Sequence, residues 1–418
     1  MAPDPGSPRK LRIGYVMQTG SPDLSSPSGP QMHICETVQG LQRSGHQVRT
    51  VAIQNGQIVW SDDLKCWSPV KFGISQKRLF RLFESALRRV QTELHLPFLG
   101  LFDSFRFADA CFQTLKGYDI LYERHGWMGY GSVIASRWLR IPLVEELNGN
   151  IIKEIESKGF KLSALQWKIS VWITRQTFIS ASHVVVVSRA LKEQIVKQLD
   201  LPEEHVSVVL NGADLTLFNQ YRDAKSLRIK YNLDNKPVVI FVSSFEPWHG
   251  VDLLVASFKS VVSRIPEARL VLVGDGSMRE AVQAQIKKLG LQDSIVLTGR
   301  LPHEQVAELT SLSDIAVAPY PYKHSEIVGT PLKLIEYMAA GKPIVASTAP
   351  IHEIIEDGVT GIRVAPADPE ALAQGISQLL ADNALRGQLS ANAQKESRNY
   401  SWEHVSRQLS ELLIRMSH

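Results

Sequence analysis

The sequence of 418 residues has only three cysteines, Cys35, Cys66 and Cys111. They form no CxxC pair and have no histidine at zinc-finger spacing, which argues against a disulfide scaffold and a structural metal, and indicates a reducing compartment. The first ten residues lack the apolar segment of a signal peptide, and no apolar run reaches the roughly 18 residues that a membrane span needs. We therefore expect a cytoplasmic protein.

The sequence also has no large excess of positive or negative charge. The chain has 46 basic and 42 acidic residues, and this net charge of +4 is too small to indicate a nucleic-acid partner. The GxGxxG fingerprint after the first strand and the P-loop sequence are both absent, which argues against a nicotinamide dehydrogenase and a P-loop enzyme. Any anionic ligand must therefore be held by local features.

Short apolar runs alternate with amphipathic helical segments along most of the chain. This rhythm predicts α/β domains with doubly wound, mostly parallel sheets, and the chain length favours two of them. A polar segment at 212–236 interrupts the rhythm, which then restarts with PVVIFVSS. We predict an N-terminal domain at 1–214, a C-terminal domain at 215–398 and a closing helix at 399–418 that could cross back to the N-terminal domain.

Residues 76–90 combine basic and apolar side chains at helical spacing. Two interpretations stay open: a helix that faces the core with a solvated basic face, or one that contacts an anionic membrane or acceptor. The apolar stripe comprises Phe80, Phe83, Leu87 and Val90, and the basic residues are Lys77, Arg78, Arg81, Arg88 and Arg89.

The strongest candidate site is SEIVGTPLKLIEYMAAGKPIVAS, residues 325–347. Pro331 precedes an apolar helix, and Lys333 falls in its first turn, where the helix dipole disfavours a cation unless an anion is near. Glu336 lies three residues later on the same face, suited to accept hydrogen bonds from ribose hydroxyls. The alternative is an exposed Lys–Glu pair without a ligand.

Two loops that follow predicted strands add weaker candidates. Gly20 lies in a glycine-containing loop after the first strand, where backbone amides could approach a phosphate. His249 and Gly250 belong to PWHG, where an imidazole could contact a diphosphate. Both segments are also compatible with ordinary turns.

Taken in order, several motifs resemble the retaining glycosyltransferases of family 4 (group 1), which have the GT-B fold, and the resemblance covers nearly the whole chain. It implies two Rossmann-like domains that face a cleft, with the nucleotide-sugar bound mainly by the C-terminal domain and the acceptor by the N-terminal domain. The motifs include GPQMHICETVQGLQRSGHQV, VVLNGADLTLF, SSFEPWHGVDLLVASF, LTGRLPHEQVAELTSLSDIAVAPY and GTPLKLIEYMAAGKPIVAS.

The resemblance also implies site residues. Glu336 matches the second glutamate of the family's pair, but the position of the first glutamate is Val328. Either Glu326 or the backbone amides of 328–330, which include Gly329 and Thr330, would then reach the donor sugar. Lys333 would be the main cation for the leaving diphosphate.

Other family positions are occupied by different residue types. Ser244 and His249 stand where the family usually has an arginine and a lysine. Arg300 lies in the expected base-contacting loop, and Arg124 or His125 match a histidine that contacts the donor sugar.

The implied reaction moves a sugar from a UDP- or GDP-sugar to a hydroxyl acceptor, with retention of configuration and without a metal or another cofactor. The acceptor would be a polysaccharide or other carbohydrate, a lipid-linked sugar or glycolipid, or a small natural product. Contact of 76–90 with the inner face of the cell membrane is compatible with this reaction. Two alternatives stay open: a catalytically silent GT-B partner subunit, and a sugar-nucleotide epimerase or phosphorylase.

Overall fold

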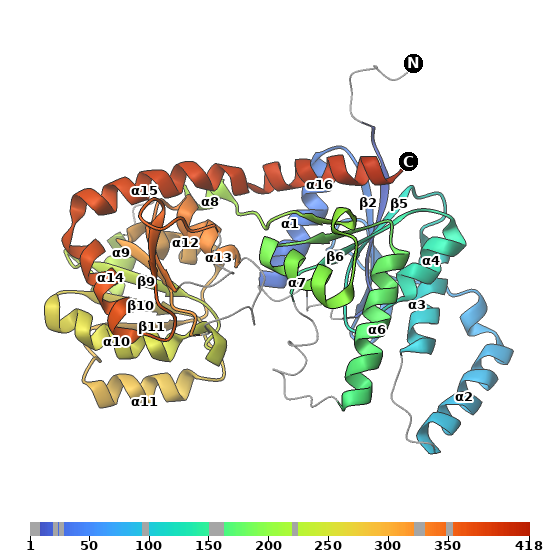
Figure 1. The fold of residues 1–418 in the computed structure, drawn as a ribbon, viewed down its shortest axis with the longest axis horizontal. Coiled ribbons are helices and arrows are strands. Elements are labelled where there is room, and N and C mark those ends of the chain that lie inside the picture. Colours follow the sequence, from blue (N-terminus) through green and yellow to red (C-terminus); the bar gives the residue numbers. More distant parts are fainter. Residues whose placement is uncertain are drawn as a thin grey trace. The chain divides into compact units, whose positions relative to one another are not determined.

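A computed structural model describes residues 9–19, 24, 29–93, 100–149, 163–219, 225–321, 331–347 and 354–418 (Figure 1). The chain forms two compact units, one of residues 1–210 with 405–418 and the other of residues 211–404. The sequence-based boundary lies slightly later, at 214/215. The final helix is divided between the units because Trp402 packs on Gly212 whereas Ser410 contacts His46.

The first unit contains an eight-stranded sheet in the order β4-β3-β2-β1-β5-β6-β7-β8. β2, β1 and β5 to β8 are parallel, and β3 and β4 extend one edge as antiparallel strands. The strands are β1 Arg12–Met17, β2 Gln47–Gln54, β3 Gln57–Ser61, β4 Ser68–Pro69, β5 Ile120–Arg124, β6 Leu143–Leu147, β7 His183–Val186 and β8 Val206–Val208.

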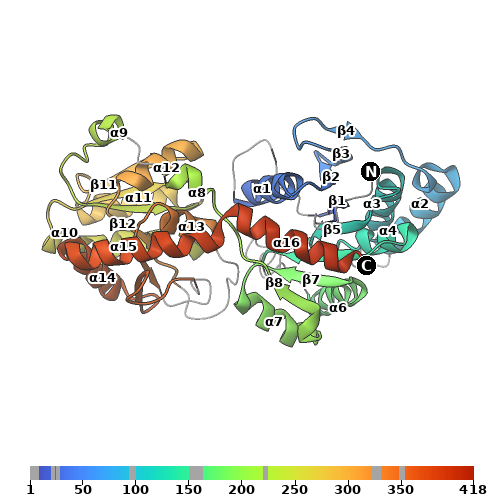
Figure 2. The same cartoon turned by 90° about the horizontal axis from the view of Figure 1, so that it is seen from above.

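Helices pack around this sheet, and the apolar residues of β1, β2, β5 and β6 form a core with one face of α3. Helix α16 lies beside α1 (Figure 2). Ser406 of α16 is so close to Gly40 of α1 that a Cβ on Gly40 would clash with it. The helices are α1 Gly29–Arg43, η1 Ile74–Gln76, α2 Arg78–Glu93, α3 Leu101–Thr114, α4 Gly131–Leu139, α6 Ala164–Ser180, α7 Arg189–Leu199, η2 Glu203–His205 and α16 Trp402–Met416.

The second unit contains a six-stranded parallel sheet in the order β11-β10-β9-β12-β13-β14. The strands are β9 Val238–Val242, β10 Arg269–Val273, β11 Ile295–Gly299, β12 Ile315–Ala318, β13 Ile344–Ser347 and β14 Gly361–Val364. The helices are α8 Leu215–Phe218, α9 Lys225–Lys230, η3 Pro247–His249, α10 Val251–Arg264, α11 Arg279–Leu289, α12 His303–Leu312, α13 Leu332–Ala339, α14 Pro369–Ala381, α15 Asn383–Ser397 and η5 Arg398–Tyr400.

The predicted pair of doubly wound α/β domains is confirmed. In each sheet the strand order reverses beside the first strand, between β1 and β5 in one unit and between β9 and β12 in the other. Ligands of such sheets bind outside the carboxyl ends of the strands at this switch point. In the described part of the chain, no helix is long and apolar enough to cross a membrane.

Candidate active site

At the switch point of the second sheet, the loops that follow the strands pack against one another, and glycines allow their backbones to come close. A Cβ on Gly250 would lie 2.0 Å from the carbonyl oxygen of Pro319, the residue that follows β12. A Cβ on Gly274 would lie 1.8 Å from the carbonyl oxygen of Ser243, and both glycines have positive φ angles. Only glycine fits this backbone without a shift. The loops after β9, β10 and β12 therefore meet at one point of the carboxyl edge.

Lys333 extends from the first turn of α13 to this point. Its side chain is buried, and Nζ donates a hydrogen bond of 3.0 Å to Oγ of Ser243. The ammonium group also lies 5.1 Å from the ring centre of Phe241 and 4.9 Å from that of Tyr320. Burial lowers the pKa of Lys333 to about 7, although the charge of Glu336 opposes the shift. An anion bound here would restore the charged form of the amine.

Glu336 lies one turn further along α13, and its side chain is 14% exposed. Its Oε1 is 2.9 Å from Nε2 of His303, at the start of α12. Burial lowers the pKa of His303, but the hydrogen bond and charge of Glu336 outweigh burial and raise it. His303 thus holds the carboxylate in place. The described contacts of Lys333 and Glu336 are not those of an exposed Lys–Glu pair.

His249 lies near the buried lysine and has a defined orientation. Its Nδ1 donates to the carbonyl oxygen of Ser244 at 2.8 Å and lies 3.1 Å from Oγ of the same residue. Burial, together with the charge of Lys333, lowers the pKa of His249 to about 3, so the ring is neutral at pH 7. Its Nε2 then carries a lone pair, and the ring could donate to a phosphate only after taking up a proton.

The remaining predicted residues of this unit fall into two groups. Pro331 is the N-cap of α13, and Arg300 is exposed directly after β11, at the same edge of the sheet. Glu326, Gly329 and Thr330 lie outside the described residues, as does Gly20 in the first unit. Their predicted roles therefore stay predictions.

In the first unit, Arg124 ends β5 beside the switch point. It donates a hydrogen bond of 3.2 Å to Nδ1 of His33 on α1, and Nε2 of His33 lies 3.3 Å from Oε1 of Glu146. Burial lowers the pKa of His33 to about 4, so the ring is neutral between the two charged groups. The three side chains come from α1, β5 and β6 and form a polar cluster at the carboxyl edge.

His125 lies next to Arg124 in sequence but points into the interior. Its side chain is 2% exposed, its Nδ1 lies 3.1 Å from Oε2 of Glu145, and its ring packs on Phe178. Burial lowers the pKa of His125 to about 4 and raises that of Glu145 to about 8. The structure therefore does not bring the His125 side chain to the cluster around Arg124, because successive residues of an extended chain face opposite sides of the sheet.

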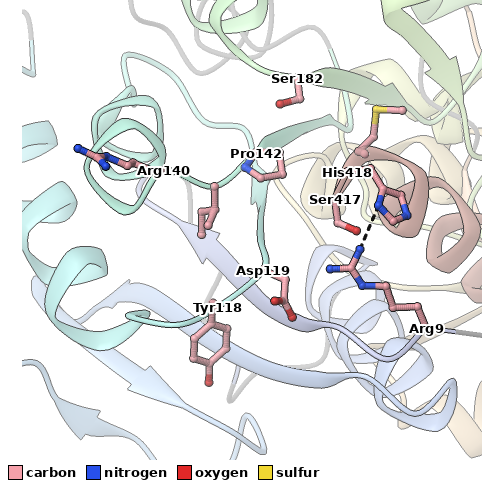
Figure 3. A pocket seen from close by; sticks show the side chains of 10 residues that line it. Arg9, Tyr118, Asp119, Arg140, Pro142, Ser182, Ser417 and His418 are labelled. Atoms are coloured by element: carbon pink, nitrogen blue, oxygen red, sulfur yellow. Dashed lines mark hydrogen bonds between the residues drawn. The ribbon is translucent and has the colours of Figure 1, made fainter. Parts of the chain in front are cut away.

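A separate pocket of about 570 Å³ lies at the opposite edge of the first sheet (Figure 3). Its lining includes Asp119, Pro142 and Ser182, each of which comes directly before a parallel strand. It is therefore at the amino ends of β5, β6 and β7, away from the edge where such sheets bind their ligands.

Two family models match consecutive parts of the chain. The model described as Glycosyltransferase Family 4 matches residues 27–217, and the model described as Glycosyl transferases group 1 matches residues 223–396. Together they include every strand of both sheets except β1, and all described candidate residues.

Individual proteins support these matches. An alpha-D-kanosaminyltransferase of Streptomyces kanamyceticus is 27% identical over 268 residues, which cover 62% of this chain and 67% of that protein. An uncharacterized glycosyltransferase of Methanocaldococcus jannaschii is 27% identical over 298 residues, covering 70% and 74%. The crystal structure of Anabaena Alr3699/HepE in complex with UDP has the same fold, with a TM-score of 0.71, 22% identity and coverage of 96% and 99%.

Proposed function

The chain belongs to the group 1 glycosyltransferases of family 4, and we propose that it transfers a sugar from a UDP- or GDP-sugar to a hydroxyl acceptor with retention of configuration. The observation that carries the proposal is the buried amine of Lys333 at the switch point of the second sheet. A buried cation is costly unless an anion accompanies it. The diphosphate of a nucleotide-sugar supplies that anion.

The proposed chemistry follows from this placement. When the bond from the sugar to the diphosphate breaks, negative charge grows on the leaving phosphate, and a charged Lys333 stabilises it. Glu336, held by His303, accepts hydrogen bonds from the ribose. Retention is assigned to attack of the acceptor on the same face as the leaving group, with the leaving phosphate as the base.

The acceptor side is assigned to the first unit. His33, Arg124 and Glu146 place hydrogen-bonding groups of both kinds at the carboxyl edge of its sheet. Hydroxyl groups both donate and accept, so a carbohydrate, lipid-linked or small-molecule acceptor matches such a cluster. We place the reaction in the cytoplasm, because all three cysteines are free thiols, as in reducing compartments.

A thermal-shift screen with UDP, GDP, dTDP and ADP tests the donor assignment. One nucleotide is expected to stabilise the protein most, since a ligand at 100 times its dissociation constant adds about 2.7 kcal/mol to the free energy of unfolding. For a unit of about 200 residues this corresponds to a rise in Tm of about 5 to 10 °C. Failure of every nucleotide to raise Tm would contradict the proposal.

Product analysis with the selected nucleotide-sugar then separates the possible reactions. A transferase releases the nucleoside diphosphate at a rate that depends on the acceptor, and the anomeric configuration of the product reports retention. An epimerase converts the donor without an acceptor, and a silent subunit neither transfers nor hydrolyses it.

A further inference from the structure

Exposed apolar side chains gather around α2 in the first unit. Ten large hydrophobic side chains are exposed in the described part of the chain, and half of them lie between residues 74 and 101. We call these five residues the apolar face: Ile74, Leu79, Leu82, Phe83 and Leu101. Single exposed hydrophobic residues are ordinary, but a cluster of this kind indicates a binding surface.

The apolar residues of α2 divide between two sides of the helix. Phe80 stacks on Phe105 of α3 with ring centres 5.0 Å apart, and the buried Glu84 accepts hydrogen bonds from Arg88 and from Arg106 of α3. These contacts attach one side of α2 to α3. On the side of α2 that faces away from α3, Leu79 is 80% exposed and Leu82 is 59% exposed. Neither sequence-based alternative anticipates this split, because both assume one apolar stripe.

The charge around this face is strongly positive. Residues 77–89 contain five basic residues and one acidic residue, a net charge equal to the +4 of the whole chain. The acidic residue, Glu84, is buried and paired with two arginines. Lys77, Arg78 and Arg89 are exposed. The exposed charges on this side of α2 are therefore cationic, whereas Asp103 of α3, near Leu101, is paired with Arg88 and Arg106.

We propose that the apolar face and its flanking cations dock this protein on an anionic lipid bilayer. Apolar side chains enter the boundary between headgroups and acyl chains, while lysine and arginine remain at the anionic headgroups. A soluble acidic protein would satisfy the cations but would not require so many separate apolar side chains facing water. The inference goes beyond the proposed function and does not rest on it.

A second exposed apolar stripe, on α6, is less suited to bind an anionic bilayer. It includes Leu165 and Trp172, but α6 carries only two cations. One of them, Arg175, is engaged by the carbonyl oxygen of Leu199 and by Asp200. The combination of apolar surface and available positive charge therefore favours α2.

The apolar face is linked, through α3, to the carboxyl edge of the first sheet, where Arg124 lies. Helix α3, against which α2 packs, begins after Gly100, where a Cβ would lie 2.8 Å from the carbonyl oxygen of Met128. Met128 belongs to the loop that follows β5. Docking through α2 thus sets the orientation of this edge relative to the bilayer.

Co-sedimentation of the full-length protein with vesicles tests the proposal. Vesicles of phosphatidylcholine with about one third phosphatidylglycerol are expected to bind the protein, and pure phosphatidylcholine vesicles to bind it far more weakly. Replacing Arg78 and Arg89 by Gln should lower the partition coefficient about thirtyfold, since each basic residue near the surface contributes a factor of about five. L82S/F83S should lower it at least about tenfold, since burial of a single leucine or phenylalanine side chain already contributes a factor of about this size.

Ile229→Ser is the matched control, because Ile229 is 71% exposed between two basic residues but belongs to the second unit. It should bind vesicles like the wild type, and Tm should show that all variants are folded. Absence of wild-type binding to the anionic vesicles, or equal binding by L82S/F83S, would overturn the proposal. So would a lipid-free dimer that L82S/F83S dissociates, since the face would then join two copies of the chain.

Discussion

Replacing Lys333 by methionine is expected to lower the rate of sugar transfer about 100- to 1,000-fold. Methionine keeps an unbranched apolar side chain against Phe241 and Tyr320 but removes the amine. The developing charge on the leaving diphosphate then loses its buried cation, and loss of one such group typically costs a factor of this size. Initial rates at saturating acceptor measure the effect.

Lys342 offers a matched control for this substitution. Lys342 lies just after the carboxyl end of α13, whereas Lys333 lies in its first turn. The Nζ of Lys342 donates to the carbonyl oxygen of Ser311, and burial lowers the pKa of Lys342 to about 8. Lys342→Met removes a partly buried amine before the amino end of β13, at the opposite end of α13 from the switch point. It should keep the transfer rate within a few-fold of wild type. Equal losses in both variants would contradict a specific role for Lys333.

Replacing Glu336 by alanine is expected to weaken donor binding about 10- to 100-fold. Hydrogen bonds to a charged group contribute about 1.5 to 3 kcal/mol, which corresponds to this range. The dissociation constant of the nucleotide-sugar selected by the thermal screen, measured by calorimetry, tests the prediction.

Two further variants show whether the effect belongs to this carboxylate. His303→Ala should weaken binding in the same direction but by less, because His303 holds Glu336 and does not itself bind the ribose in this account. Glu304→Ala removes an exposed carboxylate next to His303 and should bind like the wild type. Wild-type affinity in Glu336→Ala would remove Glu336 from the donor site.

The fold was predictable because its main signal is local. Apolar runs such as LRIGYVM and PVVIFVSS alternate with amphipathic segments, and each became a buried parallel strand. The antiparallel edge strands β3 and β4 were not predicted, since QIVWS is short and β4 has two residues. The split surface of α2 was also beyond sequence analysis, because the spacing of residues does not say which apolar side meets α3.

The candidate site was predictable in part for the same reason. Lys333 and Glu336 lie on one helix, so their shared edge follows from helical spacing. Helical spacing does not predict the partners of these two residues. Lys333 donates its hydrogen bond to the hydroxyl of Ser243, next to the predicted Ser244, and Glu336 pairs with His303, 33 residues away in sequence. Only the packing of α12, α13 and β9 brings these groups together. The inward direction of His125 likewise depends on Glu145 of the neighbouring strand.

The pH dependence of donor binding tests most directly whether Lys333 is the cation of a diphosphate site. Its pKa of about 7 in the free protein means that binding above this pH must draw in a proton. The dissociation constant of the nucleotide-sugar, whose diphosphate does not ionise in this range, should therefore rise between about pH 7 and pH 9, by at most tenfold per unit, and Lys333→Met should abolish the dependence. A wild-type dissociation constant that does not change with pH, or the same dependence in Lys333→Met, would contradict the account.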